Sequence, residues 1–146
     1  VNLIKKSLDL KVSRFIYFQT ALCYGLKPLE NPITLKHPKL PANSSYAISK
    51  TCGEQYIENS GIPYVTFRLA NVIGPRNVAG PLPIFFQRLK DGKKCFVTES
   101  RRDFVFVKDL ANVALKDKVF PEITSTGLGT PQATTVSVGV SLVAPE

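Results

Sequence analysis

Two short hydrophobic runs along this chain are dense in aromatic and β-branched residues. They are RFIYFQT at residues 14–20 and YVTFRLA at residues 64–70. Apolar runs of this length, with little alternation of polar positions, are typical of strands buried on both faces of a parallel sheet. We therefore predict one buried strand in each run.

The segment between these strands predicts a long loop followed by a helix over residues 46–59. Four prolines fall within the loop at residues 24–43, and Ser44 or Ser45 then offers an N-cap for the helix. Three apolar side chains recur at every fourth position of the helix, which predicts that they form its buried side: Ile48, Cys52 and Tyr56. A strand, a helix and a second apolar strand make a βαβ unit, so the pattern predicts a parallel sheet.

The rest of the chain gives shorter patterns. They predict an amphipathic helix at 1–10, a helix at 84–89, a short strand at 93–97, an extended segment at 102–107 and a helix at 109–116. After residue 118 the sequence is nearly uncharged and rich in Thr, Ser, Gly and Val. We therefore predict one unit at residues 1–118 and a divergent, flexible, strand-like tail at residues 119–146.

The charge of the chain favours an anionic partner. Nineteen Lys and Arg residues against 11 Asp and Glu residues give a net charge of +8, which suits a nucleotide cofactor, a phosphorylated substrate, nucleic acid or an acidic membrane. The basic residues are scattered, so nucleic acid is the weaker alternative and is not expected as a partner. No apolar run is long enough to span a bilayer, so we expect no membrane association and a cytoplasmic protein.

The cysteine and histidine content argues against a metal centre. The three cysteines are widely spaced, no CxxC pair is present, and His37 is the single histidine. A structural zinc site needs four such ligands, most of them closely spaced. We therefore expect neither a metal site nor a disulfide framework, and no catalytic duty for His37.

Polar residues follow both predicted strands and open the predicted helix. Thr20 ends the first strand, Asn71 follows the second, and Tyr46 begins the helix with Lys50 four positions further on. The carboxyl ends of parallel strands share one edge of the sheet, where ligands bind in open α/β folds. Because residues i and i+4 are neighbours on a helix surface, the phenol of Tyr46 and the ammonium of Lys50 can meet there.

Four segments, in this order and spacing, resemble the extended short-chain dehydrogenase/reductase family. They are FQTALCYG at 18–25, YAISK at 46–50, FRLANVIGPRN at 67–77 and RDFVFVKDLA at 102–111. The resemblance is to the nucleotide-sugar epimerase/dehydratase group, of the type found in bacterial surface-polysaccharide pathways, and covers about residues 14–111. It implies an α/β fold with a Rossmann-like parallel sheet and flanking helices, present in part, followed by a tail unlike the family.

The resemblance also implies the chemistry. Tyr46 takes the part of the general acid and base that removes a proton from a sugar hydroxyl, Lys50 favours the phenolate and holds the nicotinamide ribose, and Thr20 hydrogen-bonds the reacting hydroxyl. A free phenol has a pKa of about 10, so proton transfer near neutral pH needs a neighbouring positive charge. The implied cofactor is NAD, with NADP left open, because the residue that selects between them is not in the chain.

The implied ligand contacts fall into two sets. The residues implied to bind the cofactor are Tyr46, Lys50, Leu69 and Asn71. The residues implied to bind the nucleotide-sugar substrate are Asn71, Arg102 and Phe96. Asn71 and Arg102 match positions that hold the substrate diphosphate, and an arginine fork suits phosphate oxygens.

Each of these residues also has a simpler interpretation. Tyr46 and Lys50 make an ordinary surface pair in many helices, and Thr20 can merely end a strand. Asn71 can be a turn former. Arg102 can be a solvated charge, with Arg101 beside it as a competitor for its role.

The residues after Thr20 bear on the reaction. Sugar dehydratases and decarboxylases of the family usually carry an acid there, but this chain has Ala21, Leu22 and Cys23. Elimination needs a proton donor for the leaving group, so the sequence favours an epimerase, in which hydride is removed and returned. The alternatives are a nucleotide-sugar ketoreductase or dehydrogenase of the same family, or a non-catalytic remnant or dimerisation module.

The glycine-rich turn that opens the family's fold is not found in this chain. That turn holds the cofactor pyrophosphate at a helix N-terminus, whereas the first glycine here is Gly25, after the predicted catalytic threonine. We therefore expect an incomplete epimerase-like protein that is inactive alone. The resemblance further implies a homodimer formed through the helix that carries Tyr46 and Lys50.

Overall fold

The structure is a computed structural model that describes residues 1–30, 33–34, 36–96, 102–115, 134–138 and 140–141. Its helices are α1 (Asn2–Asp9), the 3-10 helix η1 (Ala21–Tyr24), α2 (Ser45–Glu58), α3 (Pro81–Lys90) and α4 (Val107–Leu115). Its strands are β1 (Phe15–Thr20), β2 (Tyr64–Leu69), β3 (Asn71–Ile73), β4 (Asp103–Phe106), β5 (Thr134–Val138) and β6 (Val140–Ser141).

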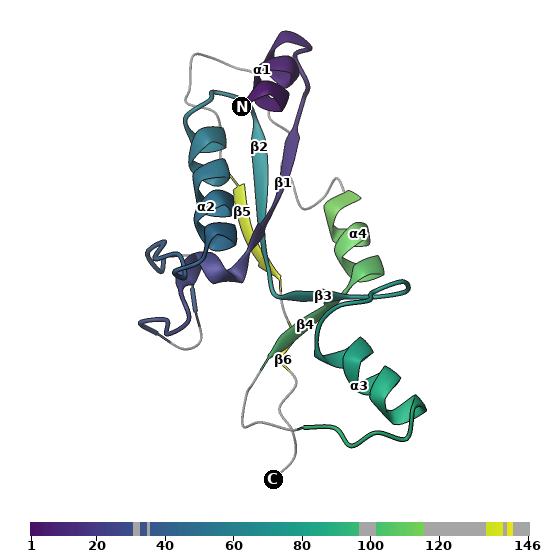
Figure 1. Ribbon diagram of the computed structural model, residues 1–146. Helices are drawn as coiled ribbons and strands as arrows, with labels where there is room; N and C mark the ends of the chain where they lie inside the picture. Colours follow the sequence, from purple (N-terminus) through teal and green to yellow (C-terminus); the bar gives the residue numbers. More distant parts are fainter. Residues whose placement is uncertain (31–32, 35, 97–101, 116–133, 139, 142–146) are drawn as a thin grey trace.

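The first sheet has the strand order β1-β2-β5, and all of its pairings are parallel. Helix α2 connects β1 to β2 and covers one face of this sheet, while α4 lies on the opposite side (Figure 1). The predicted βαβ unit and the Rossmann-like parallel sheet are therefore confirmed. Figure 1 also shows that the second sheet, in the order β3-β4-β6, begins where β2 ends.

Alternation along β2 divides the core into two clusters. Val65 and Phe67 pack with Leu110 of α4, and Val105 of β4 joins the same cluster. Tyr64 points to the other face, where it packs with Ile57 at the end of α2. A strand flanked by helices on both faces is buried throughout, and the first five residues of β2 are indeed buried.

The prediction of a buried strand was only partly right for β1. Gln19 is its one buried residue, and Phe18 is 42% exposed. The reason is position in the sheet, because β1 is an edge strand among the described residues.

The buried side of α2 differs from the prediction. The buried residues are Ala47, Thr51, Glu54 and Ile57. Ile48 and Tyr56 are 46% and 60% exposed, and Cys52 is exposed as well. The sheet explains the difference, because Gln19 and Arg68 point at α2 and Glu54 supplies the partner that these polar groups need.

Two further predictions need correction around α3. The helix begins at Pro81 rather than at residue 84, since Pro is preorganised for the first helical turn. The predicted strand at 93–97 is absent from its described residues 93–96. There the chain folds back onto α3, with the amide N–H of Lys93 donating to the carbonyl of Arg88 and the Nε of Arg88 donating to the carbonyl of Lys94, each at 2.8 Å.

Ser44 is the N-cap of α2, as predicted, because its hydroxyl accepts from the amide of Ala47 at 3.2 Å.

His37 is buried in the long loop, where its Nε2 accepts from the amide of Leu29 and its Nδ1 donates to the carbonyl of Pro38. The boundary at residue 118 stays a prediction, although β5 and β6 beyond it pair with the two sheets. No helix among the described residues is long and apolar enough to cross a membrane.

Candidate active site

The carboxyl edge of the first sheet brings together residues from two strands. Thr20 is the last residue of β1 and Leu69 is the last of β2, and their Cα atoms are partners in the parallel register. The hydroxyl of Thr20 accepts a hydrogen bond from the amide of Leu22 at 3.3 Å. A hydroxyl that accepts still carries a proton to donate, so Thr20 can also serve a ligand.

Lys50 extends from α2 to the end of β1. Its Nζ donates to the carbonyl of Phe18 at 2.5 Å and lies 4.8 Å from the centre of the Tyr17 ring. A cation over an aromatic face is attracted by the ring quadrupole. The Lys50 ammonium is therefore fixed at the backbone of Phe18, which precedes Thr20 by two residues. It has two further N–H donors for other partners.

Tyr46 lies in the first turn of α2, one turn before Lys50. Its side chain is 54% exposed, so a ligand can reach the phenol. The structure therefore places Lys50 beside the end of β1, two residues before Thr20, and Tyr46 one turn earlier on the same helix. That these three residues form one site stays a prediction. Among the described residues, no cluster of His, Cys, Asp or Glu could hold a metal ion.

Asn71 and Arg102 are brought together on the second sheet. The side-chain Nδ2 of Asn71 donates to the carbonyl of Asp103 at 2.9 Å, and Asn71 pairs with Phe104 in the register of β3 and β4. Arg102 directly precedes Asp103 and is exposed. Arg101, its competitor, lies outside the described residues.

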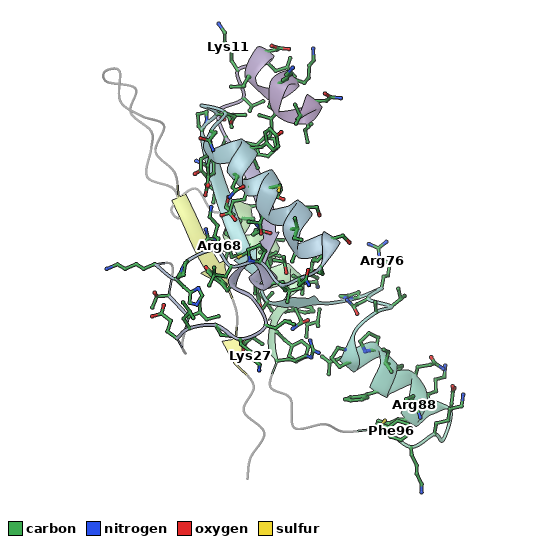
Figure 2. All side chains as sticks on the ribbon, turned by 60° about the vertical axis from the view of Figure 1, so that its left-hand side comes forward. Lys11, Lys27, Arg68, Arg76, Arg88 and Phe96 are labelled. Atoms are coloured by element: carbon green, nitrogen blue, oxygen red, sulfur yellow. The ribbon has the colours of Figure 1, made fainter. Side chains whose placement is uncertain are left out.

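Phe96 is not near the Tyr46 and Lys50 pair. It is 77% exposed, and the guanidinium of Arg88 lies 5.1 Å from the centre of its ring. Figure 2 shows these two side chains together at the far end of α3, well apart from α2. Nearer the sheet, an apolar hollow of about 340 Å³ opens between β3 and α3, with Ile73, Leu82 and Phe86 among its lining residues.

A buried polar network that the sequence did not predict lies behind this edge. Glu54 is fully buried, and its Oε1 accepts from Arg68 Nη2 at 2.8 Å and Nε at 3.1 Å. Figure 2 shows Arg68 in the interior beside α2, where its Nη1 donates to the hydroxyl of Tyr24 at 2.9 Å. Gln19 joins through a 2.8 Å bond to Glu54 Oε2. The one signal in the sequence was a charged residue, Arg68, within an otherwise apolar strand.

Burial and hydrogen bonding act in opposite directions on Arg68. Burial alone lowers the pKa of its guanidinium, but the hydrogen bonds to Tyr24 and Glu54 outweigh it and raise the pKa above its ordinary value. Arg68 is therefore a permanent cation. Nearby, burial raises the pKa of the Cys23 thiol to about 11, so this cysteine has little thiolate character and is no nucleophile.

A family model matches most of this chain. The NAD dependent epimerase/dehydratase family matches residues 1–116. The chain therefore belongs to that family. No curated protein matches the chain.

Solved structures of enzymes resemble the chain over nearly all of its length. The Bordetella bronchiseptica enzyme WbmH, solved in complex with NAD+, is 56% identical, with a TM-score of 0.79, over 94% of this chain and 43% of that one. WbmG of the same organism, solved with NAD and UDP, is 42% identical, with a TM-score of 0.77, over 96% of this chain and 43% of that one.

A more distant enzyme is also similar. The UDP-glucose 4-epimerase of Thermotoga maritima, solved with UDP-glucose, is 28% identical, with a TM-score of 0.74, over 94% of this chain and 45% of that one. The chain thus spans less than half the length of each of these three proteins.

Proposed function

We propose that the protein is an NAD-dependent nucleotide-sugar epimerase, in which this chain supplies the proton-transfer site. The observation that carries the proposal is the Lys50 ammonium fixed on the carbonyl of Phe18, two residues before Thr20, with the exposed Tyr46 one turn earlier on α2. The family match and the NAD+ bound to WbmH support it.

The residues of this edge fit the nicotinamide end of the cofactor. Lys50 has free N–H donors for ribose hydroxyls, and Leu69 offers an apolar strand end beside Thr20. When bound, NAD supplies the acceptance and return of a hydride. In the proposed reaction the Tyr46 phenolate takes the sugar hydroxyl proton and later returns it, and Thr20 holds that hydroxyl in place.

The substrate part of the proposal uses the second sheet. Asn71 and Arg102 lie together at the start of β4, where the amide and the guanidinium suit the oxygens of a diphosphate. The hollow beside α3 offers apolar surface for a nucleotide base, and Phe96 follows that helix in the chain and lies against its Arg88. The UDP bound to WbmG and the UDP-glucose bound to the Thermotoga enzyme support UDP-hexoses as the substrate class.

Epimerisation is favoured over dehydration by the surroundings of Thr20. Ala21, Leu22 and Cys23 form η1 and bring no carboxylic acid. Glu54 comes from the neighbouring helix, but it is fully buried and its oxygens accept from Arg68 and Gln19. A carboxylate held in this way cannot protonate a leaving group in an open site.

The test is a chimera in which this chain replaces the matching segment of WbmH, called the WbmH chimera below. The chimera is incubated with UDP-glucose, UDP-galactose and their N-acetylated and uronic acid counterparts, and the sugars are followed by NMR. We expect interconversion of C4 epimers without net NADH.

The control is Tyr46→Phe in the same chimera. Removing the phenol hydroxyl should lower kcat by about 10²- to 10⁴-fold, because that is the usual contribution of a general acid and base, and should leave NAD bound. Accumulation of a 4-keto-6-deoxy sugar would contradict the epimerase assignment. Stoichiometric NADH would instead identify a dehydrogenase.

We further propose a homodimer that forms through α2. Ile48, Cys52 and Tyr56 leave an apolar stripe exposed on this helix, and apolar stripes of this kind are suited to helix–helix contact. A cytoplasmic location fits both proposals, since the three cysteines are free thiols and reducing compartments keep them so.

A further inference from the structure

Gln19 connects the two halves of the proposed catalytic edge. It precedes Thr20 on β1, and its side chain points into the α2 face of the sheet with 2% exposure. Its Oε1 accepts from the backbone amide of Thr20 at 2.8 Å. Its Nε2 donates to the backbone carbonyl of Lys50 at 3.0 Å and to Glu54 Oε2 at 2.8 Å.

The buried ion pair fixes which way this carboxamide faces. A carboxylate can only accept hydrogen bonds, so the atom of Gln19 that faces Glu54 Oε2 must be the NH2 group. The carbonyl end of Gln19 is then left to face Thr20. Arg68 occupies the other oxygen of Glu54, which holds the carboxylate in the orientation that Gln19 requires.

Tyr17, which also lies on β1, contacts the same backbone carbonyl of α2 as Gln19 does. Its hydroxyl donates to the Lys50 carbonyl at 2.9 Å, and its ring lies beneath the Lys50 ammonium. Gly53 makes this approach possible, because a Cβ atom there would lie 2.5 Å from the Tyr17 hydroxyl oxygen. Two side chains of β1 thus hold one carbonyl of α2.

We propose that Gln19 is a positioning residue that sets the backbone of Lys50 against that of Thr20. This inference rests on the proposed function. In it, Gln19 touches no substrate and acts only by positioning Lys50 and Thr20. The distance between the hydroxyl that holds the sugar and the ammonium that favours the phenolate depends on how α2 sits over β1. A misplacement of about 1 Å in such a site can cost about 10²-fold in rate.

The kinetic test uses Gln19→Met in the WbmH chimera, because Met keeps the volume and removes all three hydrogen bonds. We expect kcat to fall by about 10- to 100-fold while KM changes less than about threefold. The acidic limb of the kcat–pH profile should move to higher pH, because the ammonium no longer sits where it favours the phenolate. Tyr17→Phe should change kcat in the same direction by a smaller factor.

Thr51→Val is the matched control. Thr51 is buried on the same face of α2 and its hydroxyl donates to the carbonyl of Ala47 at 2.9 Å, so the variant also loses one buried hydrogen bond. That hydrogen bond lies within the helix and involves neither Thr20 nor Lys50, so kcat and the pH profile of Thr51→Val should stay at the wild-type values. Equal losses in Gln19→Met and Thr51→Val, or an unchanged kcat in Gln19→Met, would overturn the proposal.

A second readout separates this proposal from the proposed function. Amide hydrogen exchange of the 146-residue chain should be faster at Thr20 in Gln19→Met than in wild type, and unchanged at Thr20 in Thr51→Val. If the unsubstituted chimera turns over no sugar, the epimerase assignment fails, and this exchange measurement decides whether Gln19 holds Thr20. Equal protection at Thr20 in wild type and Gln19→Met would then refute the positioning role.

Discussion

Single side chains in this protein take their roles from the partners that burial forces on them. Glu54 and Arg68 are buried in the α2 face and bond to each other, while Gln19 donates to the second oxygen of Glu54 and Tyr24 accepts from Arg68. Breaking one partner of such a buried pair typically costs about 3–5 kcal/mol. These residues therefore hold the scaffold on which the exposed Tyr46 can act.

The contact between Gly53 and Tyr17 gives a prediction at the residue scale. Replacing a helical Gly with Ala ordinarily stabilises a protein by about 1 kcal/mol. Here Gly53→Ala should destabilise by about 1–2 kcal/mol, because the new Cβ displaces the Tyr17 hydroxyl from the Lys50 carbonyl. The free energy of unfolding in urea measures the effect.

The control for that prediction is the same substitution in a Tyr17→Phe background. Without the hydroxyl, the nearest ring atom lies 3.2 Å from the Cβ position, so Gly53→Ala should then be neutral or stabilising. Additive effects of the two substitutions would show that the contact does not limit this position.

At the scale of elements, the two sides of α2 differ in burial and polarity. Its buried side presents Glu54 and Thr51 to the sheet, while its exposed side presents Ile48 and Tyr56. The apolar periodicity of this helix therefore describes a surface rather than the core.

The proposed dimer gives the prediction for this element. Ile48→Glu places a charge within the exposed stripe, so we expect it to shift the WbmH chimera from dimer to monomer in light scattering. Its unfolding free energy per monomer should change by less than about 0.5 kcal/mol, as at other exposed sites. Lys39→Glu is the control, since Lys39 lies outside the stripe and pairs with Glu58. A dimer of unchanged strength in Ile48→Glu would exclude this interface.

At the scale of the whole molecule, one sheet is parallel and the other is mixed, and a shared core joins them through Val105. The described residues leave the outer edge of β1 without a neighbouring strand. Such an edge exposes backbone donors and acceptors that favour pairing with another chain. The residues that we propose for sugar chemistry and for the diphosphate lie at the two different sheets.

This arrangement predicts how the 146-residue chain behaves by itself. We expect weak or undetectable NAD binding in calorimetry, because no glycine-rich turn in the sequence offers backbone amides to the pyrophosphate. Self-association through the β1 edge should appear in light scattering. The WbmH chimera serves as the positive control for NAD binding, and micromolar affinity in a monomeric 146-residue chain would contradict the prediction.

The sequence by itself determined the βαβ unit, the N-cap at Ser44, Thr20 as the end of β1, and the helix that carries Tyr46 and Lys50. These features depend on local periodicity and on the direction of parallel strands, and both can be inferred from short stretches of residues. The pairing of Asn71 with Arg102 came instead from the family resemblance, and the structure places Asn71 in β3 and Arg102 directly before β4.

Only the tertiary structure decided which side of α2 is buried and what lies behind the catalytic edge. Gln19 meets Glu54 across 35 positions of the sequence, and Arg68 meets Tyr24 across 44. No local pattern encodes such pairs, and hydropathy ranks the polar side of α2 as the exposed one. The physical reason is that a buried polar group needs a hydrogen-bond partner that is near it in space. In this fold Glu54 has such partners and is buried, whereas Ile48 is exposed.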